Sequence, residues 1–242
     1  MEKLSEEQKE IINKAKKYIK EIFKEDSSGH DIEHSLRVYK NALEISSSVM
    51  KQQENNNDLK LNIFTIGLSA LLHDVDDYKI KNYNKDNHFQ NLDRFFKENH
   101  INTEEDIKLI KEIISEVSFK AGETQTPKSL EGKIVQDADR LDALGAIGIA
   151  RAFAFGGSKN RKLYDINNIH ELSQRNFETF DIKKVSFEQY KKGNTDTVTH
   201  FYEKLLKLEN MMNTDYGKNI AKKRTDLMKN FLNNLFEEVI EK

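Results

Sequence analysis

The chain has 242 residues, of which 37% are hydrophobic and 33% are charged, and its net charge is −2. One proline and ten glycines favour long helices over a multistranded β fold, which needs many turns. Acidic and basic residues are mixed, which argues against the concentrated basic surface that nucleic acids and anionic membranes require. The absence of cysteine excludes disulfides and thiolate chemistry.

The N-terminal run MEKLSEEQKE is polar and lacks the apolar core of a signal peptide. No apolar run approaches the roughly 18 residues of a membrane span. We therefore expect a cytoplasmic protein with no membrane partner and no nucleic-acid partner.

The first half of the chain shows apolar residues at helical spacing. Ser5 and Gln8 fit a capping box at the start of the first helix, and Asp31 is suited to cap the second. Amphipathic helices are predicted at about 5–24, 31–50, 85–98 and 103–117.

The segment from about 59 to 75 differs from these helices. Residues 63–72 are apolar nearly all round, which predicts a helix that is buried on most sides. This segment is too short to cross a bilayer. His73 and Asp74 lie at its end.

The second half begins with a predicted helix at about 129–144 and a stretch of small residues that is expected to stop at Gly156-Gly157. Residues 158–194 are polar and mixed, which suggests a lid or an insertion. Two final helices are predicted at about 195–213 and 215–240.

Four residues stand out chemically, because each lies on, or at the end of, a helix with a strongly apolar face. An ionised carboxylate is costly in such a place unless a cation or hydrogen bonds compensate it. Imidazole nitrogen with carboxylate oxygen suits Mn²⁺, Fe²⁺, Co²⁺, Ni²⁺ or Zn²⁺ better than Ca²⁺. The alternative is that each side chain is a hydrogen-bonded core residue. The four residues are His34, His73, Asp74 and Asp137.

The chain contains a second His-Asp pair, His30-Asp31. This pair follows a Ser-Ser-Gly break, and its aspartate is explained as a helix cap. Position on a buried helix therefore separates His73-Asp74 from it.

The spaced pattern of a histidine, a His-Asp pair and a later aspartate resembles the metal-binding signature of the HD-domain superfamily of phosphohydrolases. In that family four side chains from separate helices converge on a divalent metal, and they map here to His34, His73, Asp74 and Asp137. Four longer runs resemble the YpgQ-like branch, namely HDIEHSLRV (30–38), LLHDVDD (71–77), QDADRLDALGAIG (136–148) and HFYEKLL (200–206).

The resemblance implies an all-α HD-domain helical bundle with additional C-terminal helices. It implies one domain over 1–242, with the metal-site core at about 27–145 and the helices of about 195–240 packed on it. The implied activity is hydrolysis of nucleoside triphosphates, particularly deoxy forms, to a monophosphate and pyrophosphate. The implied cofactor is one divalent metal ion, with Mn²⁺ preferred and Mg²⁺, Co²⁺, Ni²⁺, Fe²⁺ and Zn²⁺ as alternatives.

A carboxylate is needed to orient the attacking water and accept its proton. Asp77 is the first choice, because it lies three residues after Asp74 and shares its helix face if the helix continues. Related HD nucleotidases place an acid at this same offset. Asp76 is the substitute candidate, and an ordinary surface acid is the alternative for Asp77.

Charge develops on phosphoryl oxygens during transfer, so cations should surround them. The candidate phosphate contacts are Lys79, Arg140 and Lys204. Arg140 and Arg37 can instead hold nearby metal ligands in place. His200 either contacts substrate or packs in the core, whereas His88, His100 and His170 are expected at the surface.

Two other functions remain open from the sequence. The same site could serve a nucleoside monophosphatase or a phosphodiesterase, because substrate choice depends on the pocket. A nucleotide-binding sensor with little turnover is a further alternative. The sequence does not specify the native metal, the preferred base and sugar, or the oligomeric state.

Overall fold

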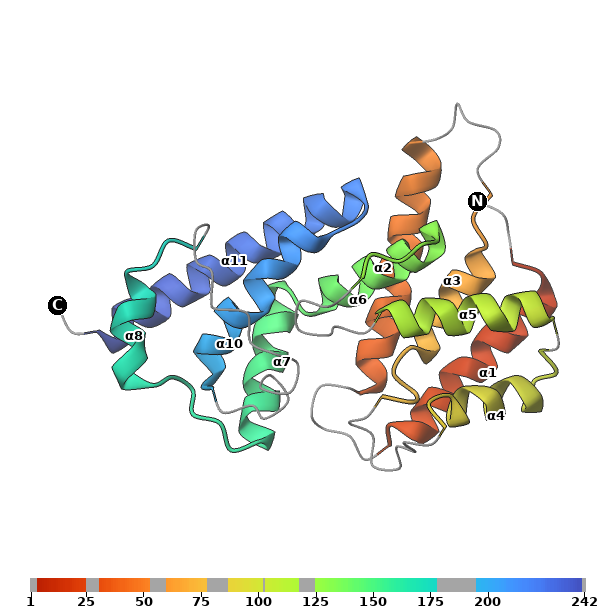
Figure 1. Ribbon diagram of the computed structural model, residues 1–242, viewed down its shortest axis with the longest axis horizontal. Helices are drawn as coiled ribbons and strands as arrows, with labels where there is room; N and C mark the ends of the chain where they lie inside the picture. The colour runs from red at the N-terminus through yellow and green to blue at the C-terminus, as the bar shows by residue number, and fades with distance from the viewer. Residues whose placement is uncertain are drawn as a thin grey trace. The chain divides into compact units, whose positions relative to one another are not determined.

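A computed structural model describes residues 4–24, 31–52, 60–77, 87–101, 103–117, 125–177 and 195–240 (Figure 1). Every regular element in these ranges is a helix, so the all-α prediction is confirmed. None of the helices in this part of the chain combines the length and the apolar character needed to cross a membrane.

The chain divides into two compact units, and the boundary falls within one helix, after Asp139. The first unit comprises Met1–Ser118 with Gln125–Asp139, and the second comprises Phe119–Thr124 with Arg140–Lys242. The expectation of one domain, with the last helices packed on the metal-site core, stays a prediction.

The first unit is built around one central helix. Its helices are α1 (Glu6–Ile22), α2 (Ile32–Gln52), α3 (Ile63–Leu72), α4 (Gln90–Glu98), α5 (Glu104–Val117) and the first part of α6 (Leu130–Asp142). Helix α3 packs against α1, α2 and α5, and all ten of its residues are buried (Figure 1). The prediction of a helix buried on most sides is confirmed.

Local signals explain where these helices start. Ser5 and Gln8 form the predicted capping box of α1, and the Asp31 carboxylate accepts a 2.8 Å hydrogen bond from the His34 amide at the start of α2. Helix α3 covers the residues 63–72 for which the sequence predicts a buried helix. Asn62 caps this helix through the Thr65 amide, so the helix begins at Ile63 and the chain turns after its last residue, Leu72.

The second unit contains α7 (Gly145–Ser158), α8 (Ile166–Ser173), α10 (Thr197–Glu203), the 3₁₀ helix η1 (Leu205–Met211) and α11 (Asp215–Val239). Helix α11 packs against α7, α8 and η1. Three aromatic rings, from Phe153 on α7, Phe201 on α10 and Phe231 on α11, contact one another with centroids 5.7 to 6.2 Å apart. This cluster ties the three helices together.

The structure adds detail to three predictions for this unit. Helix α7 ends at Ser158, directly after the predicted stop at Gly156-Gly157, and an added Cβ at Gly156 would lie 2.3 Å from the Thr197 hydroxyl. The range 158–194 contains α8, which Asp165 caps, and its part from 178 to 194 lies outside the described residues. The helix predicted at about 195–213 is divided into α10 and η1.

Candidate metal centre

His34 and His73 come from two different helices of the first unit. His34 lies in the first turn of α2, where Asp31 holds its backbone amide. His73 follows the last residue of α3, and its Nδ1 lies 2.9 Å from the Ala70 carbonyl oxygen. A carbonyl can only accept, so Nδ1 carries a hydrogen and donates. The Nε2 lone pair of neutral His73 is therefore directed away from the helix, toward the cluster.

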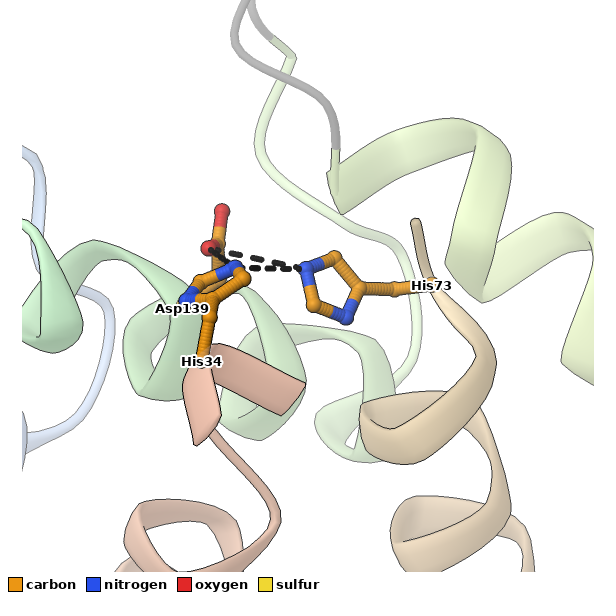
Figure 2. Close-up of side chains that lie close together, drawn as sticks. All are labelled: His34, His73 and Asp139. Carbon is orange, nitrogen blue, oxygen red and sulfur yellow. Dashed lines mark hydrogen bonds and ion pairs between the residues drawn. The ribbon is translucent and has the colours of Figure 1, made fainter. Parts of the chain in front are cut away.

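The two imidazoles converge with two carboxylates. The Nε2 atoms of His34 and His73 lie 3.2 Å apart, and each lies 3.4 Å from a carboxylate oxygen of Asp74. From α6, Asp139 Oδ1 lies 3.4 Å from His34 Nε2 and 3.7 Å from His73 Nε2 (Figure 2). Four donor side chains, from α2, from the end of α3 with the turn after it, and from α6, thus face one small volume.

This donor set fits a divalent cation. Nitrogen and oxygen ligands lie about 2.1 Å from such an ion, with ligand–ion–ligand angles of about 90° to 109°. Two ligand atoms of one ion are therefore about 3.0 to 3.4 Å apart. One ligand atom each from His34, His73 and Asp139 lies within 4.8 Å of the others. Both imidazoles and Asp74 are buried, so the negative charge of the Asp74 carboxylate needs a compensating positive charge.

The pKa values of the cluster show the same need for positive charge. Burial alone lowers the pKa of His73, but Asp74 and Asp139 outweigh burial and raise it to about 9. Burial raises the pKa of Asp139, yet the neighbouring His73 holds it well below its usual range. Without a metal, the carboxylates therefore retain a proton on the imidazole.

The acid that α6 brings to this cluster is Asp139, whereas the sequence pointed to Asp137. These aspartates are two residues apart on one helix, so they project in different directions. Asp137 is fully buried, and its role as a metal ligand stays a prediction. The Ala138 carbonyl between them accepts a 3.2 Å hydrogen bond from Asn41 of α2, which fixes α6 against the helix that carries His34.

The two acids after Asp74 have different surroundings. Asp77 is half-buried, and its amide donates to the Asp74 carbonyl at 3.0 Å, so it belongs to the same turn. The Asp76 carboxylate instead accepts hydrogen bonds from the amides of Asn91 and Leu92, both at 2.9 Å. Asp76 is thus engaged at the start of α4, which disfavours it as the water-activating acid.

The predicted phosphate contacts and the other histidines lie in varied surroundings. Arg140 is buried in the second unit, where its guanidinium donates to the Met211 carbonyl. Lys204 is partly buried at the end of α10, and Lys79 lies outside the described residues. Their roles as phosphate contacts stay predictions. As predicted, His88, His100 and His170 are exposed, whereas Arg37 and His200 are partly buried.

Comparisons with known proteins agree with this picture. The HD domain family matches residues 31–144. The chain is 32% identical to Bacillus subtilis YpgQ over 226 residues, which cover 92% of this chain and 90% of that protein. A crystal structure of YpgQ in complex with ADP aligns with a TM-score of 0.66, at 26% identity and 96% coverage of both chains.

Two further crystal structures are similar over nearly the whole chain. A Lactobacillus plantarum protein aligns with a TM-score of 0.75 at 32% identity, covering 98% of both chains. An HD-superfamily hydrolase from Bacillus thuringiensis aligns with a TM-score of 0.64 at 36% identity, covering 96% of this chain and 97% of that one. With its histidine and aspartate cluster, the chain belongs to the HD-domain superfamily of hydrolases, in the YpgQ-like branch.

Proposed function

We propose that this protein is a metal-dependent phosphohydrolase that cleaves nucleoside triphosphates, deoxy forms in particular, to a monophosphate and pyrophosphate. The observation that carries the proposal is the convergence of two imidazoles and two carboxylates on one volume, with nitrogen and oxygen donors 3.2 to 3.7 Å apart. The ADP found with the YpgQ relative supports a small nucleotide as the ligand.

The metal ligands in this proposal are His34, His73, Asp74 and Asp139, with Asp139 in place of Asp137. When bound, a divalent ion polarises a phosphoryl oxygen and lowers the pKa of a water molecule. The mixed nitrogen and oxygen donors suit Mn²⁺ and its first-row neighbours. Mn²⁺ is our first choice.

Asp77 is the proposed general base. It lies on the turn that carries Asp74, and its half-buried carboxylate belongs to the same short stretch as the two ligands His73 and Asp74. A carboxylate at this place can orient a water molecule and accept its proton as the water attacks the α-phosphorus. The bond between the α-phosphorus and the oxygen that bridges it to the β-phosphorus then breaks, and pyrophosphate leaves.

The experiment is a screen of nucleoside mono-, di- and triphosphates, in ribo and deoxy forms, against Mn²⁺, Mg²⁺, Co²⁺ and Ni²⁺, with identification of products. We expect pyrophosphate from deoxynucleoside triphosphates. Inorganic phosphate released from a monophosphate would favour a monophosphatase instead. Tight nucleotide binding by the metal-loaded protein with no product over hours would contradict any hydrolase and indicate a sensor.

His73→Ala and Asp74→Ala complete this experiment. Each removes a donor to the proposed ion, so we expect loss of bound metal and of hydrolysis while the far-UV circular dichroism stays helical. Full activity in either variant would contradict the assignment of the site.

A further inference from the structure

Asp74 and Asp77 lie beyond the regular part of α3. This helix ends at Leu72, and the next four residues form a turn. Within the turn, the Val75 amide donates to the Leu72 carbonyl at 3.2 Å and the Asp77 amide donates to the Asp74 carbonyl at 3.0 Å. These two local bonds do not connect the turn to any other element, so the placement of Asp74 depends on longer-range contacts.

Such contacts come from α4. The Asp76 Oδ1 accepts from the Asn91 amide and its Oδ2 accepts from the Leu92 amide, both at 2.9 Å. The Asn91 side-chain amide donates in return to the Val75 carbonyl at 2.8 Å. Three hydrogen bonds therefore connect the turn after the His-Asp pair to the first turn of a helix that begins 14 positions later in the chain.

Helix α4 has its own need for these bonds. Its N-cap residue, Phe89, makes no side-chain capping hydrogen bond, so the free amides of the first turn need an acceptor from elsewhere. The Asp76 carboxylate supplies both oxygens, and its negative charge is also favourable at a helix N-terminus. One side chain thus caps α4 and holds the turn that carries a proposed ligand.

The other end of this connection is firmly anchored in the core. Leu92, Phe95 and Phe96 of α4 are at most 3% exposed. Tyr18 of α1 donates to the Asn91 carbonyl at 2.8 Å. Helix α4 is therefore held in place by both its apolar face and its first turn. Because Asp76 binds α4, it also restricts the movement of the turn that follows α3.

We propose that Asp76 is a positioning residue that holds Asp74 and Asp77 in place at the metal centre by binding the first turn of α4. This inference rests on the proposed function, because it assigns Asp74 to the metal and Asp77 to the water. It gives Asp76 a role other than the substitute general base suggested by the sequence. Outer partners of metal ligands typically contribute roughly 10 to 100-fold to metal affinity.

The test is the affinity for Co²⁺, followed by the visible absorption of the bound ion, in Asp76→Ala and Asp76→Asn proteins. We expect affinity to fall at least about tenfold in Asp76→Ala, with a changed absorption spectrum. Asp76→Asn keeps one acceptor oxygen for an α4 amide, so its loss should be smaller. Asn91→Ala removes the side-chain bond to Val75 but keeps both backbone amides that bind Asp76, and it serves if Asp76→Ala does not fold. We expect a smaller loss of the same sign.

Asp165→Ala is the matched control. Asp165 caps α8 in the second unit by accepting from the Asn167 amide at 3.0 Å, so its removal takes away a helix cap without touching this turn. We expect its Co²⁺ affinity to equal that of the natural protein.

Natural Co²⁺ affinity and an unchanged spectrum in folded Asp76→Ala would overturn the positioning role. An equal loss in Asp165→Ala would also overturn it, since general destabilisation would then explain the effect. Failure of the natural protein to hydrolyse any nucleotide while it binds Co²⁺ would contradict the proposed reaction only. Failure to bind Co²⁺ would overturn the metal centre and this inference together.

Discussion

The Nε2 atoms of His34 and His73 lie 3.2 Å apart although 39 positions separate the two residues in the sequence. Two nitrogen lone pairs that face each other need a proton or a cation between them. The surrounding carboxylates of Asp74 and Asp139 supply the negative charge that attracts either one. Metal binding and proton binding should therefore compete at this site.

The first prediction concerns this competition. Asp74 and Asp139 overcome the effect of burial and raise the pKa of His73 to about 9, so the metal-free imidazole is protonated at pH 7. Ligation uses the Nε2 lone pair, so binding must release about one proton, and metal affinity should rise between pH 6 and pH 9. Calorimetric titration with Mn²⁺ in two buffers of different ionisation enthalpy measures this release. Equal binding enthalpies in both buffers would show that no proton leaves.

The second prediction separates the two neighbouring aspartates of α6. Asp139→Asn removes a charged donor from the cluster, so Co²⁺ affinity should fall by more than the roughly 10 to 100-fold that an outer partner contributes. The proposal assigns the metal to Asp139 and not to Asp137, so the nearly isosteric Asp137→Asn should lower the Co²⁺ affinity much less. Titration of both variants with Co²⁺ measures the two affinities. A larger loss of affinity in Asp137→Asn than in Asp139→Asn would indicate that Asp137 is the ligand.

The third prediction concerns Asp77. Replacement by asparagine keeps the shape of the side chain and removes its ability to accept a proton. The hydrolysis rate at saturating substrate should fall about 10² to 10⁴-fold, the usual contribution of a general base, while Co²⁺ affinity is unchanged. A natural rate in Asp77→Asn would place the base elsewhere. Reduced Co²⁺ affinity would make Asp77 a ligand rather than a base.

The fourth prediction concerns α3, the centre of the first unit. Leu71 is fully buried in this helix, and Leu71→Ala leaves a cavity in a close-packed core. The free energy of unfolding should fall by about 2 to 5 kcal/mol, measured by urea denaturation. Leu163 is 60% exposed, so Leu163→Ala is the matched control, and its effect should stay within about 0.5 kcal/mol. Equal effects of the two substitutions would show that α3 is not a close-packed core element.

Signals that act between near neighbours were readable in the sequence. The capping box of Ser5 and Gln8, the cap at Asp31 and the all-round apolar character of 63–72 each depend on residues within one or two helical turns. The structure contains all three features. Similarly, His34, His73 and Asp74 could be singled out because each stands next to a strongly apolar stretch.

Features that depend on contacts between residues far apart in the chain could not be predicted from the sequence. The apolar face of the helix and the resemblance to the HD-domain signature favoured Asp137, and Asp137 is fully buried. The cluster, however, lies at the edge of the core, where the Asp139 side chain is 27% exposed. Similarly, the need for a residue without a side chain at Gly156 comes from Thr197, which lies 41 positions later and whose hydroxyl would be 2.3 Å from an added Cβ.

The most direct test of the central claim is mass spectrometry of the products formed from a deoxynucleoside triphosphate by the Mn²⁺-loaded protein in ¹⁸O-labelled water. Attack at the α-phosphorus should place the label in the deoxynucleoside monophosphate and leave the pyrophosphate unlabelled. Label in pyrophosphate or in inorganic phosphate, or the absence of any product, would contradict a nucleotide pyrophosphohydrolase that uses the His34, His73, Asp74 and Asp139 centre.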